Sequence, residues 1–178
     1  MKELSLNILD IANNSVKAGA TLLEITVIQR EGRMTVSVKD DGCGMSAEQV
    51  SRLSDPFYTT RTTRKVGLGI PFLKLAAEQA GGGVTVTSVP AGGDGPHGTT
   101  VTACFDMNNI DCTPLGDIVE TVVTLIQGSP DMDLVFCHIV DDKQIRLDTR
   151  ELRSVLGDVS LASYEVLAWI REYLHEQY

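Results

Sequence analysis

The chain has 178 residues, of which 43% are hydrophobic and 5% aromatic, and its formal net charge is -9. This length supports one full hydrophobic core and a small second subdomain, but not two large domains. The negative charge argues against nucleic acid or an anionic membrane as a main partner, because phosphate groups require a basic surface. No apolar run approaches the roughly 18 residues of a membrane-spanning helix, and the first residues lack the features of a secretory signal, so we expect a cytoplasmic protein.

The cysteines are widely scattered along the chain and form no CxxC pair. This spacing is typical neither of a zinc knuckle nor of a disulfide framework. We therefore expect all the cysteines to be reduced thiols. They are Cys43, Cys104, Cys112 and Cys137.

An amphipathic helix is predicted over residues 2–18, where apolar residues recur at helical spacing. Its other face carries Asn7, Asp10, Asn14 and Lys17 at intervals of three, four and three, which form one polar stripe. The carboxylate of Asp10 and the amide oxygen of Asn14 would suit a water molecule and a magnesium ion, and Lys17 could reach a phosphate. The alternative interpretation is a solvated helix face.

The segment Asp40-x-Gly42-x-Gly44 offers a fixed acceptor beside backbone that a flat ring could approach closely, because glycine has no side chain. The alternative is a plain turn, since Asp-Gly is a common turn dipeptide. The flanking elements are two hairpin strands at 21–29 and 33–39 and a short helix opened by the capping-box pair Ser46 and Gln49.

Residues 55–66 are rich in Thr and Arg without hydrophobic periodicity, which indicates a loop of a length and composition suited to a mobile lid. Its apolar anchor and its cations are Phe57, Arg61, Arg64 and Lys65. The loop ends at Gly67-Leu68-Gly69, and Pro71 lies in the first turn of the helix that follows. The amide groups and dipole of such a helix start suit a polyphosphate, although a helix cap without a ligand is the alternative.

Strands are expected at about 84–89 and 99–105, and Gly98-Thr99-Thr100 leads into the second of them. Beyond residue 111 the pattern changes to a helix near 115–127, a hairpin and two further helices. The hairpin strands lie near 133–140 and 143–147, Asp148 and Glu151 have capping-box spacing, and the last helix has an apolar stripe of Tyr164, Leu167, Ile170 and Leu174.

Four segments of the chain, in their order, resemble the boxes of the gyrase, heat-shock chaperone, histidine kinase and mismatch-repair ATPases. They are ILDIANNSVKAGA, KDDGCGM, DPFYTTRTTRKVGLGI and HGTT, and the resemblance covers about residues 4–105. The third segment is similar to the phenylalanine box and lid of histidine kinases, so we place the chain nearest to them. The string GxxxxGK[ST] does not occur, and GxGxxG occurs only at residues 93–98, between two expected strands rather than before a helix, so the sequence does not indicate the commonest competing nucleotide folds.

The resemblance implies an adenine and metal site. By it, Asn14 would hold a magnesium ion and Asp40 would accept a hydrogen bond from the adenine amino group. Gly42 and Gly44 would let the base approach, and Thr100 looks like the threonine that assists Asp40.

The resemblance also implies a phosphate site, in which Gly67 and Gly69 would serve the phosphates. We expect Lys17 and Arg61 to neutralise phosphate charge and Asp10 to act as the candidate base. The ATPase branches have a glutamate at that position. Aspartate is one methylene shorter, so we expect hydrolysis to be slow.

The expected fold is a Bergerat-type two-layer α/β sandwich, with a mixed, mostly antiparallel sheet, helices on one face and ATP bound between helices. We expect an ATP-binding domain at residues 1–110 and a small α+β extension at 111–178, which either extends the core or docks a partner; we favour docking by analogy. Because the chain begins at the first box, we expect a stand-alone form without phosphoaccepting helices.

The leading functional hypothesis is a magnesium-dependent enzyme that binds ATP and passes the γ-phosphate to a separate, unidentified protein. The second is a regulatory ATPase or nucleotide-gated switch, and the third is an interaction module that has lost the nucleotide. The oligomeric state, a homo-oligomer included, is left open. The histidines of the chain lack the context of a phosphoacceptor helix, so self-phosphorylation is not expected.

Overall fold

The computed structural model describes residues 3–53 and 68–178, and the elements expected there all occur, with bounds shifted by a few residues. In chain order they are α1 (Leu4–Lys17), β1 (Leu22–Arg30), β2 (Arg33–Asp40), α2 (Ala47–Ser51), α3 (Gly69–Gln79), β3 (Gly83–Val89), β4 (Gly98–Asp106), α4 (Ile118–Gly128), β5 (Asp133–Val140), β6 (Lys143–Asp148), α5 (Thr149–Leu156) and α6 (Tyr164–Gln177).

The strands form one six-stranded sheet in the order β3-β4-β2-β1-β5-β6. Among the described strands, only the β1–β5 pair is parallel, so the predicted mixed, mostly antiparallel sheet is confirmed. That parallel pair runs from Leu22 opposite Asp133 to Gln29 opposite Val140. The segment after residue 110 therefore continues the same sheet.

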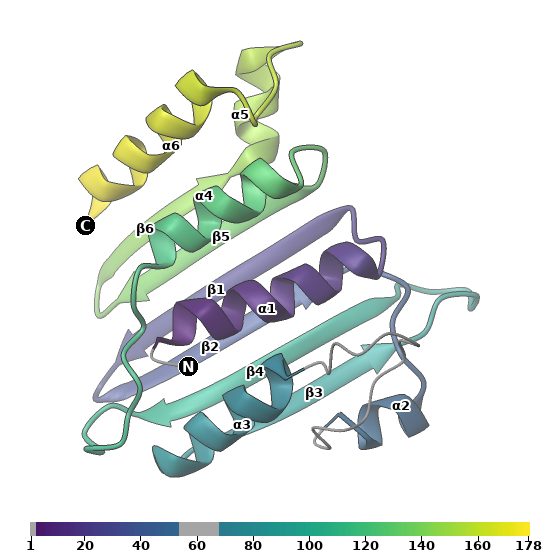
Figure 1. Ribbon diagram of the computed structural model, residues 1–178, viewed down its shortest axis with the longest axis vertical. Coiled ribbons are helices and arrows are strands. Elements are labelled where there is room, and N and C mark those ends of the chain that lie inside the picture. The colour runs from purple at the N-terminus through teal and green to yellow at the C-terminus, as the bar shows by residue number, and fades with distance from the viewer. Residues whose placement is uncertain (1–2, 54–67) are drawn as a thin grey trace.

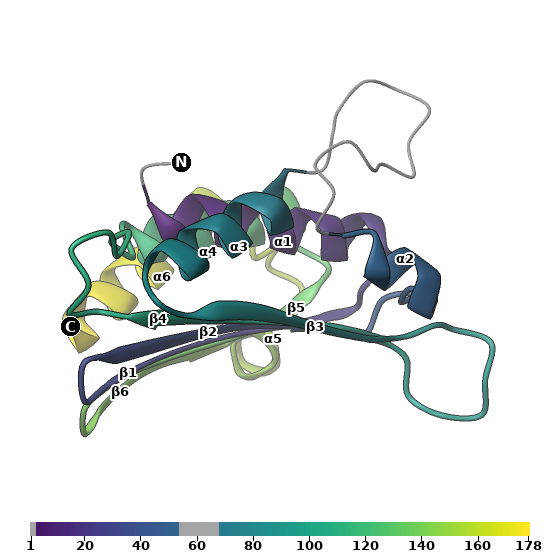
Figure 2. The same ribbon diagram turned by 90° about the horizontal axis from the view of Figure 1, so that it is seen from below.

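Four helices cover one face of the sheet in the spatial order α3, α1, α4, α6 (Figure 1). Figure 2 shows them above the strands, which confirms the predicted two-layer sandwich. Helix α5 is an exception, because Figure 2 shows it below the strands. In the described ranges 3–53 and 68–178, no helix is long and apolar enough to cross a membrane.

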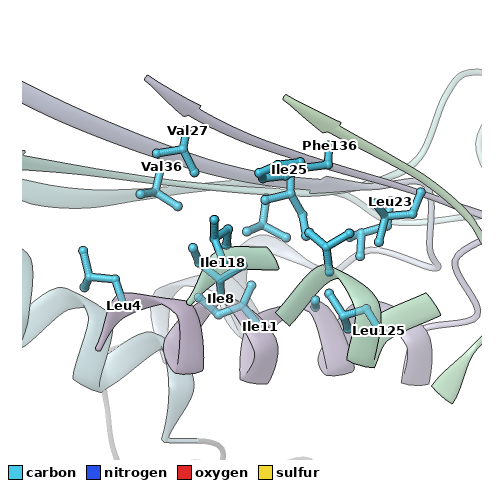
Figure 3. Packing of buried hydrophobic residues seen from close by; sticks show 14 of the residues in the cluster. Leu4, Ile8, Ile11, Leu23, Ile25, Val27, Val36, Ile118, Leu125 and Phe136 are labelled. Carbon is cyan, nitrogen blue, oxygen red and sulfur yellow. The ribbon is translucent and has the colours of Figure 1, made fainter. Parts of the chain in front are cut away.

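The core lies between this helix layer and the sheet (Figure 3). Strand residues alternate between the two faces, so Leu23, Ile25 and Val27 of β1 all point at the helices and are fully buried. Leu4 and Ile8 of α1 pack against them from the helix layer and are equally buried. Each such side chain stabilises the fold by about 1.5–3 kcal/mol relative to an exposed one.

One of the two predicted helix capping boxes is confirmed. Ser46 and Gln49 form the predicted capping box. Asp148 caps α5 by accepting from the backbone N–H of Arg150, but Glu151 pairs with Arg146, so the second predicted capping box is wrong. All four cysteines are free, as expected.

The apolar stripe predicted for α6 is confirmed at three of its four positions. Leu167, Ile170 and Leu174 are buried, whereas Tyr164 is 82% exposed. The prediction is wrong for Tyr164 because six residues at about 100° each rotate this position by about 120° from the buried Ile170.

Candidate functional site

The carboxylate of Asp40 lies at the end of β2 and points to the helix side of the sheet, like the buried Val38. The Ser15 hydroxyl of α1 donates to its Oδ2 atom at 2.5 Å. The backbone N–H groups of Gly42 and Thr99 donate to Oδ1 at 2.8 and 3.3 Å. Charge-assisted hydrogen bonds of this kind hold an ionised acceptor in a fixed orientation.

Thr99, rather than Thr100, is the threonine that the sheet brings to Asp40. Thr99 is directly opposite Asp40 in the β2–β4 register, whereas Thr100 is opposite Lys39. Successive residues of a strand point to opposite faces, so the Thr100 side chain lies on the face of the sheet opposite α1. The register therefore places the Thr99 side chain, and not that of Thr100, on the same face of the sheet as Asp40.

A second serine, which sequence reasoning missed, ties the loop after β2 to the sheet. Ser88 Oγ of β3 lies 2.8 Å from Thr99 Oγ1 and accepts from the Met45 N–H at 2.8 Å. His97 Nδ1 lies 2.5 Å from the carbonyl oxygen of Gly42. The loop is therefore held by Ser88 of β3 and by His97, which directly precedes β4, and only the pairing of β3 with β4 reveals the part that Ser88 plays.

Both glycines of this loop pack against the chain itself. A Cβ atom at Gly42 would lie 2.9 Å from the Cβ of Ala18. Gly44 has φ +68°, and a Cβ there would lie 2.0 Å from the carbonyl oxygen of Val89. The loop conformation therefore requires glycine at both positions, independently of any ligand.

The neighbouring Asp41 fastens the start of β1 to the end of β2. Burial alone would raise its pKa, but hydrogen bonds from the Thr21 hydroxyl and from the backbone N–H groups of Leu22 and Thr21 outweigh burial and lower the pKa. Asp41 is thus a structural carboxylate, whereas the Asp40 side chain faces α1.

The start of α3 lies beside Asp10 of α1. A Cβ atom at Gly69 would lie 3.2 Å from the Cβ of Asp10 and 3.6 Å from Cγ1 of Ile11. The first backbone N–H groups of a helix have no acceptors within that helix, and the dipole makes this end attractive to anions. An exposed carboxylate and a helix N-terminus are therefore brought together.

The predicted polar stripe on α1 is only partly exposed. Asp10, Asn14 and Lys17 are exposed, but Asn7 is 1% exposed. Its Nδ2 atom has no hydrogen-bond partner among the described residues. The stripe prediction is wrong for Asn7, because helical spacing alone does not show which side of α1 the neighbouring helices cover.

The expected lid and its residues Phe57, Arg61 and Gly67 lie outside the described residues. Within residues 3–53 and 68–178, no group of three or more His, Cys, Asp or Glu side chains could hold a metal ion. On α1, the exposed Asp10 and Asn14 provide one carboxylate and one amide oxygen as ligands for a metal ion. Two protein oxygens fit Mg²⁺, which commonly takes one or two carboxylates together with waters and substrate phosphates.

The polar groups lie along one helix. Asp10 lies beside the start of α3, and Ser15 is hydrogen-bonded to Asp40. Asp10 and Ser15 are five residues apart on α1, which corresponds to about 7.5 Å along the helix axis at 1.5 Å per residue. An oriented acceptor at one end, a helix N-terminus at the other and exposed oxygen ligands between them suit a ligand with a flat polar ring and an anionic tail.

Residues 2–109 match the family described as histidine kinase-, DNA gyrase B-, and HSP90-like ATPases. This match spans more than half of the chain, and the protein belongs to this family of ATP-binding domains.

Among its relatives are two sensor histidine kinases. ZraS of Klebsiella oxytoca is 37% identical over 89 residues, which cover 48% of this chain and 19% of that kinase. YkoH of Bacillus subtilis (strain 168) is 32% identical over 104 residues, which cover 56% of this chain and 22% of that kinase. The chain thus matches about a fifth of the length of each.

Among solved structures, the crystal structure of the N-terminal domain of a DNA repair protein is similar to this fold. The TM-score is 0.58 at 16% sequence identity, and the similarity covers 89% of this chain and 58% of that chain. At this identity the likeness concerns the fold alone. It extends well beyond the segment that matches the family.

Proposed function

We propose that this protein binds ATP with Mg²⁺ and transfers the γ-phosphate to a separate protein. The observation that carries the proposal is the Asp40 carboxylate, which Ser15, Gly42 and Thr99 hold beside α1. Membership of an ATPase family and the match to sensor histidine kinases support ATP as the ligand.

Asp40 would accept a hydrogen bond from the adenine amino group, because its carboxylate is already oriented by three donors. Gly42 and Gly44 would present backbone to the ring. The β2–β4 register favours Thr99 over Thr100 as the threonine that assists Asp40.

Asn14 would hold the magnesium ion, with the Asp10 carboxylate one turn away to orient a water of its shell. When bound, Mg²⁺ neutralises charge on the phosphates during transfer. The start of α3 at Gly69 would receive the phosphates, and the exposed Lys17 would add a positive charge. Arg61 and Gly67, outside the described residues, are part of this proposal.

Asp10 is the candidate base, since its exposed carboxylate lies beside the α3 N-terminus where the phosphates would bind. It would take the proton from the attacking group of the partner protein, or from water if hydrolysis occurs. Catalysis would otherwise rest on positioning and charge neutralisation. We place the reaction in the cytoplasm.

Calorimetric titration with ATP and Mg²⁺ tests the nucleotide site. We expect saturable binding that Asp40→Asn abolishes and that Asp142→Asn, in the exposed β5–β6 turn, leaves unchanged. Absence of binding by the unmodified protein would contradict the proposal.

The reaction is tested with ATP labelled in the γ-phosphate and candidate partner proteins. Label on a protein supports transfer, whereas label found only as free phosphate supports a slow ATPase or switch. Asp10→Asn should depress either rate, and an unimpaired Asp10→Asn variant would count against Asp10 as the base.

A further inference from the structure

Helix α6 is the outermost helix of the layer, and among the described residues no other helix lies beyond it (Figure 1). Its underside packs on the sheet through the buried Ile170 and Leu174. On the side of α4, the Arg171 guanidinium pairs with Glu120. In the part of the chain that the structure describes, no helix therefore covers the flank of α6 that faces away from α4.

Two aromatic rings occupy this flank. Trp169 and Tyr173, one helical turn apart, stack with their centroids 4.8 Å apart and their planes within 13°. Trp169 is 46% exposed and Tyr173 is 36% exposed. Stacking against each other restricts both side chains, so the surface offers a preorganised aromatic platform, and aromatic residues are enriched where proteins bind one another.

Three glutamates surround the platform. Glu165 lies four residues before Trp169, and Glu172 lies three residues after it. Glu176 lies three residues after Tyr173. This spacing places all three glutamates on the same flank of the helix. All three are exposed, and within the described part of the chain none of them takes part in an ion pair. We call the surface formed by these three glutamates together with Trp169 and Tyr173 the α6 outer face.

The charges on this face are not arranged for the stability of the helix. Glu172 and Glu176 are like charges at i, i+4 spacing, and they lie in the C-terminal half of α6, where the helix dipole favours cations. A cation from outside would remove both unfavourable interactions. Arg171, the arginine of α6, cannot serve because it is held by Glu120 on the other side.

We propose that the α6 outer face is a docking site for a basic segment of a partner protein. An Arg or Lys side chain would lie over the Trp169 and Tyr173 rings, and the glutamates would pair with its charge or with that of a neighbouring basic residue. The net charge of -9 favours encounter with a basic partner. A second copy of this chain fits poorly, because a two-fold contact would bring the same three glutamates against each other.

This surface is distinct from the nucleotide site, and the inference goes beyond the proposed function: it holds whether phosphate is transferred, hydrolysed or retained. Trp169 is the only tryptophan of the chain, so its fluorescence reports on this face alone. The probe is an acetylated tetra-arginine peptide without aromatic residues, titrated at low salt because exposed charges are screened at high salt.

We expect a saturable change in Trp169 fluorescence. Glu172→Gln/Glu176→Gln should weaken the apparent affinity about tenfold or more, which is about 1.4 kcal/mol. The matched control Asp141→Asn/Asp142→Asn removes the same charge from the β5–β6 turn and should change affinity less than about twofold. Circular dichroism and ATP binding of both double variants should match the unmodified protein.

Three results would overturn the proposal. One is the absence of a saturable fluorescence change. Another is equal weakening by both double variants, which would mean general attraction to an acidic protein. The third is a dimer in sedimentation analysis that Trp169→Ala dissociates, which would make a second copy the occupant of the face.

Discussion

The hydroxyl of Ser15 donates a 2.5 Å hydrogen bond to the Asp40 carboxylate and thereby joins the last turn of α1 to the end of β2. Ser15 is 3% exposed, so water cannot readily replace this bond. Helix α1 also carries Asp10 and Asn14, and the bond therefore fixes the position of the proposed metal ligands relative to the proposed adenine acceptor.

Ser15→Ala should lower the free energy of unfolding by about 1–2 kcal/mol, because a hydrogen bond to a charged group is lost. The urea midpoint measures this change, and calorimetry should show weaker ATP binding in the same variant. Ser37→Ala, on the face of β2 that points away from α1, is the matched control and should alter neither quantity appreciably. Equal effects of the two substitutions would remove the special role of Ser15.

Thr99→Val and Thr100→Val distinguish the two threonines. Thr99→Val removes the hydroxyl that meets Ser88 beside Asp40 and should weaken ATP binding about tenfold, equivalent to about 1.4 kcal/mol. Thr100→Val changes the face of the sheet that points away from α1 and should leave binding nearly unchanged. Calorimetric titration of both variants is decisive, and a larger loss in Thr100→Val would contradict the role assigned from the register.

Gly69→Ala should push the start of α3 away from α1, because the added Cβ would lie 3.2 Å from the Cβ of Asp10. We expect weaker ATP binding and a loss of stability of about 1–3 kcal/mol, partly offset by the better helix propensity of alanine. Gly128→Ala in α4 meets no atom within 4 Å and should stabilise the protein by up to about 1 kcal/mol. Thermal unfolding and calorimetry measure both effects, and unimpaired ATP binding by Gly69→Ala would refute the assigned contact.

Burial lowers the pKa of His138, whose ring nitrogens lie 2.6 Å from the Tyr178 hydroxyl and 2.9 Å from Gln29 Oε1. The unfolded state therefore binds the proton more readily, and stability should fall as the pH drops below about 6.5, the ordinary histidine value. The contribution of this group is at most about 1.4 kcal/mol per pH unit. Urea unfolding from pH 7.5 to 5 should show a smaller dependence in His138→Gln; an identical pH dependence in both proteins would rule out His138 as the source.

Much of the fold could be predicted from the sequence because its signals are local. The apolar spacing of α1, the alternation in β1 and β2 and the capping pair Ser46 and Gln49 involve residues only a few positions apart. The order of the four boxes in turn indicated the nucleotide-binding family. The roles given to Asp10, Asn14 and Asp40 rest on that order and stay predictions.

Contacts between remote residues decided the rest. Whether Thr99 or Thr100 meets Asp40 depends on the register of β2 with β4, and a shift of one residue would exchange the two faces. Asn7 is buried by the way the helices pack, and Ser15 becomes part of the site only through Asp40 of β2. The sequence by itself therefore determined which elements form and which motifs they carry, because periodicity and turn chemistry act over a few residues. Only the tertiary structure decided which side chains meet, including the attachment of the C-terminal hairpin beside β1, because strand register and helix packing depend on pairings between segments far apart in the chain.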